Sequence, residues 1–380
     1  MKITKILIII ILALFPFGEL LRFDIGNNIV FKPLDLVVVV TALVWLIHII
    51  FQKRKISLKK EFLFFPLIGL ISLILNSTWI KPYEFLVSSF YLIRWLAYSS
   101  LFFIVLGFDN NFKYKIKLFL FIDGLIILFL GFIQYFFFSS LKSFYYLGWD
   151  EHMYRMFSVF LDPNYAGAFF VLYFLFIGDF VYKRKKERRY LVIILLLTLI
   201  AIFLTFSRSA LLMLIVGSFV YLFIIGRKKL ILILLGSVIL FALIFSSKFY
   251  VENMNLFRRS SIEARLGNYS TALKIFTDRP LLGVGFNSYR YAKQMYGIQM
   301  KWVNAPSHAD AGVDNSFLFV LATTGIIGLL SYLYLWTGFM KKGTILVISS
   351  IIALFVDALF INSLFFPPLM LWMWFILALL

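Results

Sequence analysis

Long apolar blocks separated by short polar segments run along almost the whole chain. A helix needs roughly 20 apolar residues to cross a hydrocarbon core of about 30 Å, so each long block is a candidate transmembrane helix. Twelve blocks can be counted, at residues 3–17, 34–51, 61–78, 83–107, 118–138, 165–182, 190–206, 209–226, 230–247, 314–337, 344–361 and 365–380. The pattern predicts an all-α polytopic membrane protein with about 12 transmembrane helices, folded as a single transmembrane domain over residues 1–380.

The composition supports this interpretation. Hydrophobic residues make up 62% of the chain and charged residues only 14%, whereas a soluble globular chain is nearer half apolar and about a quarter charged. These values exclude a soluble enzyme, a disordered chain and a coiled coil. The chain has no cysteine, which excludes disulfides, thiolate metal sites and a cysteine nucleophile.

The basic residues are distributed unevenly between alternate loops. The net charge of +19 would suggest a nucleic-acid partner in a soluble protein, but the cytoplasmic loops of membrane proteins collect Lys and Arg. With the longest loop set aside, 21 Lys and Arg fall on the side of the N-terminus and six on the other. We therefore expect no nucleic-acid partner and both termini in the cytoplasm.

One long loop, residues 248–313, is predicted to lie on the outer side as a partly helical cap. It carries nine Lys or Arg and four Asp or Glu. Ser260 followed by Glu263 is typical of a capping box, and apolar residues then recur at helical spacing at positions 262, 266, 269, 273 and 276. Asp278-Arg279-Pro280 is expected to end this helix.

Motifs of soluble enzymes are missing from the sequence. It has no P-loop, no nucleophile-elbow serine, no paired-histidine zinc motif and no Asp-x-Asp pair. Asp310 and Asp314 are four residues apart, but two carboxylates alone are a weak signal for a metal. We therefore expect neither a metal nor a cofactor.

Polar residues between the apolar blocks are candidates for chemistry. Arg208 lies in a tight hairpin between two long apolar helices, where desolvation of its guanidinium is costly unless an anion meets it. The alternative is an interfacial anchor. Asp162-Pro163-Asn164 is a turn that either caps the helix after it or contacts substrate.

Arg94, Asp123 and Asp357 lie inside predicted spans, where they are expected to form internal ion pairs, for example Arg94 with Asp123.

Four segments carry a family resemblance in chain order: 157–167 around Asp162-Pro163-Asn164, 205–212 around Ser207-Arg208-Ser209, 263–285 from Glu263-Ala264-Arg265 to Leu281-Leu282-Gly283-Val284-Gly285, and 307–330 around Asp314-Asn315. Together they make the chain resemble the O-antigen ligase and O-antigen polymerase superfamily from about residue 155 to 330. Members are polytopic enzymes that move glycans built on a polyprenyl diphosphate lipid at the outer face of the inner membrane.

The resemblance implies a site and partners. Arg208 and Arg265 match positions that hold the diphosphate, and Asn164, Arg290 and Asn315 are supporting residues. The implied partners are a polyprenyl-diphosphate-linked glycan donor, an acceptor glycan, the lipid bilayer and a chain-length regulator protein. The implied location is the inner membrane, with an extracytoplasmic active site and a role in lipopolysaccharide or polysaccharide biosynthesis.

One departure from the family pattern bears on the reaction. Ligases carry a His immediately before the Asn that opens the helix after the large outer loop, whereas this chain has Asp314 before Asn315, and His308 lies six residues earlier. This favours a polymerase, with a ligase acting on lipid A core or another acceptor as the alternative. Asp314 or His308 is the candidate general base. Asp314 is also a good candidate to cap the following helix.

Two rival hypotheses remain at this point. A polysaccharide flippase or another secondary transporter also has about twelve spans, but transporters show internal repeats and midplane sites, and no repeat is present here. A glycosyltransferase with a monophosphate lipid donor would use acidic residues of the first outer loop, where Glu19 and Asp24 lie.

Overall fold

The computed structural model describes residues 2–26, 29–52, 60–147, 149–184, 188–244, 260–298 and 312–379. Its helices and strands are α1 (Lys2–Leu14), η1 (Phe15–Leu20), β1 (Phe23–Gly26), β2 (Ile29–Phe31), α2 (Pro33–Phe51), α3 (Lys60–Leu75), α4 (Pro82–Leu106), α5 (Asn110–Phe137), η2 (Lys142–Leu147), η3 (Ser158–Phe160), α6 (Pro163–Lys183), α7 (Arg188–Leu204), α8 (Arg208–Ile224), α9 (Lys228–Ile244), α10 (Ser260–Asp278), α11 (Tyr289–Met295), α12 (Ser316–Met340), α13 (Ile345–Ala358), η6 (Ser363–Phe365) and α14 (Pro367–Leu379).

Each of the twelve apolar blocks contains a helix, which confirms the all-α prediction. In the described residues, six helices are long and apolar enough to cross a membrane: α1 continued by η1, α2, α4, α5, α6 and α12. Shorter apolar helices are α8, α13 and α14. The chain is thus an integral membrane protein with several spanning helices, and the count of about 12 spans stays a prediction. The short antiparallel hairpin β1–β2 was not predicted.

Polar caps and prolines fix where several helices begin. Asp109 Oδ1 accepts from Phe112 N at 2.8 Å at the start of α5, and Thr344 caps α13 through Val347 N. Pro33, Pro82 and Pro163 stand at the first positions of α2, α4 and α6. Such residues satisfy or remove backbone N–H groups that have no partner in the first turn of a helix.

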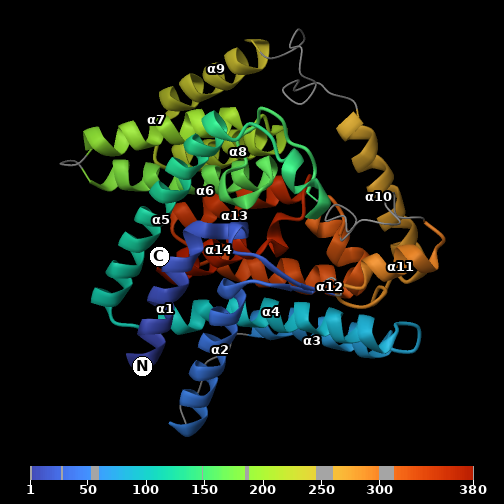
Figure 1. Cartoon of the computed structure of the whole chain (residues 1–380). Helices are drawn as coiled ribbons and strands as arrows, with labels where there is room; N and C mark the ends of the chain where they lie inside the picture. Colours follow the sequence, from blue (N-terminus) through green and yellow to red (C-terminus); the bar gives the residue numbers. More distant parts are fainter. Residues whose placement is uncertain are drawn as a thin grey trace.

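Helices α13 and α14 form the centre of the bundle. Figure 1 shows them between α6–α8 and the layer of α3, α4 and α12, and α14 packs on α4 while α13 packs on α8 and α6. Every residue of α14 from Pro367 to Ala378 is buried. Trp372 meets Phe169 edge-on at 5.1 Å, and Trp374 stacks on Trp336 at 5.8 Å. A helix that is apolar on all sides is stable only in such a central position.

A close backbone contact, in which two glycines take part, joins the segment after α10 to α12. Gly325 breaks α12 with a φ of 67°, and a Cβ there would lie 2.2 Å from Leu281 O. Gly283 has a φ of 64°, and its Cβ would lie 2.4 Å from the carbonyl carbon of Thr323. Val284 N donates to Ala322 O at 3.1 Å across this contact. Only glycine combines this backbone conformation with so close an approach, so the Leu281–Gly285 run is a structural clasp.

The cap helix forms as predicted, but its buried face is different. Helix α10 covers Ser260–Asp278 and, with the unpredicted α11, lies at one end of the bundle (Figure 1). Leu266 and Leu273 are exposed, whereas Ala272 and Ile275 are buried in a cluster with Phe319 of α12. The buried face is offset from the expected one because the small Ala272 allows close packing on α12. The ends of the predicted cap and the hydroxyl of Ser260 lie outside the described residues.

The buried charges pair differently from the expectation. Arg94 of α4 forms an ion pair with Asp35 of α2, not with Asp123, and Tyr98 Oη donates to Asp35 Oδ1 at 2.6 Å. The pairing of Arg94 with Asp123 is therefore wrong, because α4 packs against α2. Asp123 is buried in α5 and Asp357 is fully buried at the end of α13.

Candidate active site

A cavity of about 750 Å³ lies between the bundle and the helices α10 and α11. Its wall combines aromatic rings with charged side chains from segments far apart in sequence. The cationic lining residues are Arg22, Lys32, Arg94, Arg155, Arg265 and Arg290, and the acidic ones are Glu19, Asp150, Glu151, Asp162 and Asp314. Such a cavity is large enough for a polar headgroup and sugar units.

The structure brings most of the predicted site residues to this cavity. Asn164, Arg265, Arg290 and Asp314 all line it. Arg208 does not belong to the lining, although it is only half-buried and close enough to Arg265 for the two positive charges to oppose each other. Two guanidinium groups near each other, one of them in the cavity wall, form a region where an anion is favoured.

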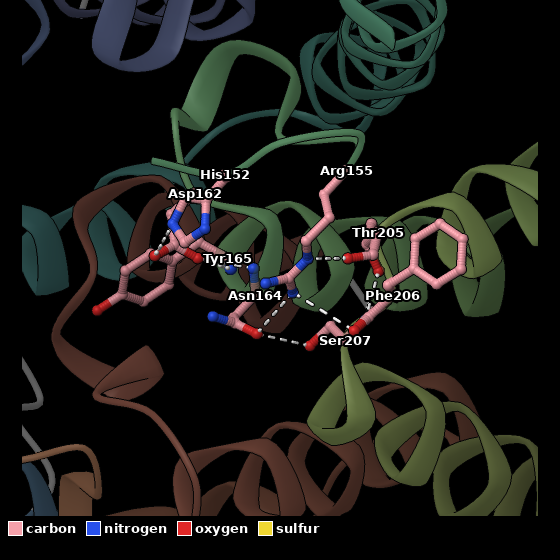
Figure 2. Close-up of polar contacts among 8 residues, drawn as sticks. All are labelled: His152, Arg155, Asp162, Asn164, Tyr165, Thr205, Phe206 and Ser207. Carbon is pink, nitrogen blue, oxygen red and sulfur yellow. Dashed lines mark hydrogen bonds and ion pairs between the residues drawn. The ribbon is translucent and has the colours of Figure 1, made fainter. Parts of the chain in front are cut away.

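The turn before Arg208 is held by a hydrogen-bond network, which Figure 2 shows. Arg155 Nε donates to Thr205 O at 2.8 Å, and its Nη2 lies 3.4 Å from both Phe206 O and Asn164 Oδ1. Phe206 has a φ of 48°, which costs energy in a residue other than glycine. Arg155, only 3% exposed, therefore stabilises a strained turn whose last residue, Ser207, caps α8.

Asn164 connects this turn to the start of α6. Its Oδ1 also accepts from Ser207 Oγ at 3.0 Å. Asp162, the residue two before it, caps α6 by accepting from Asn164 N at 2.6 Å and Tyr165 N at 3.2 Å. The capping interpretation of the Asp-Pro-Asn turn thus holds for Asp162, while Asn164 contacts the Arg208 turn and lines the cavity.

Arg155 and His152 are among the cavity residues that the sequence analysis missed. His152 Nε2 lies 3.8 Å from Asp162 Oδ2. This contact is drawn as a dashed line in Figure 2. In the sequence, Arg155 is not distinguished from the other basic residues of the loops that are predicted to lie on the outer side. The signal that distinguishes it is its position directly before the apolar Met156-Phe157, because an arginine flanked by buried residues needs hydrogen-bond partners.

Asp314 stands at the cavity with polar neighbours on the cap helix. Asn268 Nδ2 donates to its Oδ2 at 3.4 Å, and Tyr269 Oη donates to its backbone oxygen at 3.0 Å. Burial raises the pKa of the Asp314 carboxyl above its usual value, and the charge of Arg265 offsets part of the rise. A carboxylate whose pKa is raised in a cavity is a better proton acceptor than an ordinary one.

The suggestion that Asp314 caps the next helix is wrong. Helix α12 begins at Ser316, so Asn315 occupies the N-cap position. Its Oδ1 accepts from Phe317 N and Leu318 N, both at 2.9 Å. Asn315 therefore supports the site by fixing the start of α12, and Asp314 is left to face the cavity. His308 lies outside the described residues.

The N-terminal third contributes a wall that the sequence analysis did not assign to the site. Lys32 Nζ forms an ion pair with the buried Glu19 at 2.6 Å, and the Arg22 guanidinium lies 5.5 Å from the centre of the Trp149 ring. Glu19 is thus held by a cation. Among the described residues no group of three or more His, Cys, Asp or Glu is placed to hold a metal ion. Independence from metal stays a prediction.

Residues 193–333 match the family model for O-antigen ligase. No curated protein matches the chain. The family match covers the Arg208 turn, α10, the clasp and the start of α12. It supports the resemblance of this part of the chain to the O-antigen ligase and polymerase superfamily.

Proposed function

We propose that this protein is a polysaccharide polymerase-type glycosyltransferase, which moves a glycan from a polyprenyl diphosphate lipid to a sugar hydroxyl in the 750 Å³ cavity. The observation that carries the proposal is the placement of Arg265 and Asp314 on the same cavity wall, with Arg208 close to Arg265. The reaction needs a cationic diphosphate site and a proton acceptor beside it.

In the proposed reaction the acceptor oxygen forms a bond to the anomeric carbon of the donor sugar. The bond from that carbon to the diphosphate oxygen breaks, and the diphosphate lipid leaves with the electron pair. Negative charge grows on the leaving group, and Arg265 and Arg208 stabilise it because a guanidinium binds phosphate oxygens in pairs and stays charged. Arg155 and Asn164 hold the turn that precedes Arg208.

The acceptor hydroxyl loses its proton as the new bond forms. Asp314 is our candidate for the group that receives this proton, because it lines the cavity and its carboxyl has a raised pKa. His308 is the competing candidate. After transfer, Asp314 returns the proton to water that enters the cavity, which completes the cycle.

A polymerase is favoured over a ligase by one residue. Asp314 occupies the position directly before Asn315, where ligases of the superfamily hold a His, and Asn315 is the N-cap of α12. A transporter is disfavoured by the position of the polar residues. The charged residues of the cavity come mostly from loops, helix ends and helices α10 and α11, with Arg94 inside α4 as the exception, whereas transporters bind substrate at the middle of their helices.

The purified protein in liposomes tests the proposal. With a polyprenyl-diphosphate-linked repeat unit as the sole substrate, a polymerase should release polyprenyl diphosphate and leave lipid-linked chains of many repeats. A ligase should release diphosphate only when a lipid A core acceptor is added. Movement of intact lipid-linked glycan across the liposome without diphosphate release would instead identify a transporter and overturn the proposal.

A further inference from the structure

A second cavity, of about 280 Å³, lies between α5, α6 and α7, far from the candidate active site. It is next to Phe180, sixteen residues along α6 from Asn164, which corresponds to about 24 Å of helix. Two cations, Lys117 and Arg184, line it, and the described lining residues include no Asp or Glu. This cavity plays no part in the proposed glycan transfer.

The two cations meet at one aromatic ring. Lys117 Nζ lies 5.1 Å and the Arg184 guanidinium carbon 5.0 Å from the centre of the buried Phe180 ring. Asp179, the residue before Phe180, forms an ion pair with Lys183 at 2.9 Å and accepts a hydrogen bond from Tyr221 Oη at 3.0 Å. Two like charges held together in this way at half-buried positions attract an anion.

The surroundings are those of a membrane interface. Tyr114 and Tyr190 line the cavity and are 56% and 71% exposed, and tyrosines collect where headgroups meet the hydrocarbon core. Leu118, which also lines the cavity, is 49% exposed on the outer surface of the helices. A ligand with an anionic head and an apolar tail fits this combination of cations, tyrosines and leucine.

We propose that this cavity binds the phosphate headgroup of an anionic phospholipid. Lys117 and Arg184 contact the phosphate oxygens, and the acyl chains lie along Leu118 and the neighbouring apolar surface. Basic pockets between transmembrane helices recognise anionic lipid heads by these charges, and the guanidinium of Arg184 matches phosphate geometry. By the charge bias of the loops, this end of the bundle faces the cytoplasmic leaflet.

The experiment measures lipid binding by the full-length protein in neutral nanodiscs. Titration with phosphatidylglycerol should raise its melting temperature, and equal phosphatidylcholine should not. Lys117→Ala and Arg184→Ala should each weaken the phosphatidylglycerol response about fivefold. The matched control is Lys115→Ala, since Lys115 is exposed on the same helix and does not line the cavity. Lys117→Arg keeps the charge and should retain binding.

Three results would overturn the proposal. The first is an equal loss in Lys115→Ala, which would mean that surface charge alone attracts the lipid. The second is stabilisation by inorganic phosphate at the same concentration, which would identify a soluble anion as the ligand. The third is full binding by Lys117→Ala and Arg184→Ala. Because the readout is lipid binding and not glycan transfer, failure here leaves the proposed function untouched.

Discussion

Ser207 Oγ donates a 3.0 Å hydrogen bond to Asn164 Oδ1, and this contact joins two segments that lie 43 residues apart in sequence. Ser207 is the N-cap of α8 and directly precedes Arg208, while Asn164 stands in the first turn of α6. The position of Arg208 is therefore set by α6 as well as by its own hairpin. The Asp162-Pro163-Asn164 turn and the Ser207-Arg208-Ser209 hairpin, each a weak signal in the sequence, therefore contact each other in the fold.

The first prediction concerns Arg155 as a positioning residue. Arg155→Lys should lower kcat at least tenfold with little change in KM, because the compact ammonium of Lys lacks the planar fork with which Arg155 reaches Thr205 O, Phe206 O and Asn164 Oδ1. In an Arg208→Lys background the same change should add almost nothing, since both act through Arg208. Fully additive losses in this cycle would show that Arg155 acts independently of Arg208.

The second prediction concerns the two arginines that we assign to the diphosphate. Arg208→Lys and Arg265→Lys should each lose activity by more than a hundredfold, because one donor in such a site contributes about 3 kcal/mol to the transition state. Expression and the melting temperature in detergent should be unchanged. Near-normal glycan length in either variant would reduce that arginine to an anchor at the membrane surface.

The third prediction concerns the proton acceptor. Asp314→Asn should bind the lipid-linked donor but lose turnover, because an amide cannot accept the proton. Burial raises the pKa of Asp314, so wild-type activity should be lost, as the pH falls, at a pH above the usual Asp value of about 3.9. His308→Ala is measured in the same assay. Activity retained by Asp314→Asn and abolished by His308→Ala would transfer the role to His308.

The fourth prediction concerns the clasp between the cap and α12. Gly283→Ala and Gly325→Ala should each destabilise the protein by at least about 2 kcal/mol, since both need a positive φ and have no space for a Cβ. The control is Gly178→Ala in α6, where a Cβ meets nothing within 4 Å and alanine favours the helix. Thermal melting in detergent ranks the three variants, and equal melting of all three would contradict the clasp.

The fifth prediction concerns the side of the membrane on which the cap lies. Because the chain has no cysteine, Ser270→Cys gives a single thiol at an exposed position of α10. An impermeant thiol reagent should label it in intact spheroplasts, whereas Lys115→Cys should react only after lysis. The reverse pattern would invert the topology and place the candidate active site in the cytoplasm.

The sequence alone determined where the helices form. The apolar blocks dictate them, since a backbone in hydrocarbon must satisfy its hydrogen bonds internally, and polar residues such as Asp162 mark where they begin. It also pointed to Arg265 and Asp314, through the resemblance of segments 263–285 and 307–330 to the O-antigen ligase and polymerase superfamily.

Only the tertiary structure decided which residues meet. Arg94 pairs with Asp35 and not with Asp123, and Arg155 holds the turn before Arg208, because helix packing brings these segments together. Helix α12 begins one residue later than an N-cap at Asp314 would require, so Asn315 caps the helix and Asp314 faces the cavity. Periodicity along one helix carries no information about its neighbours, so the partners of a buried charge follow from packing alone.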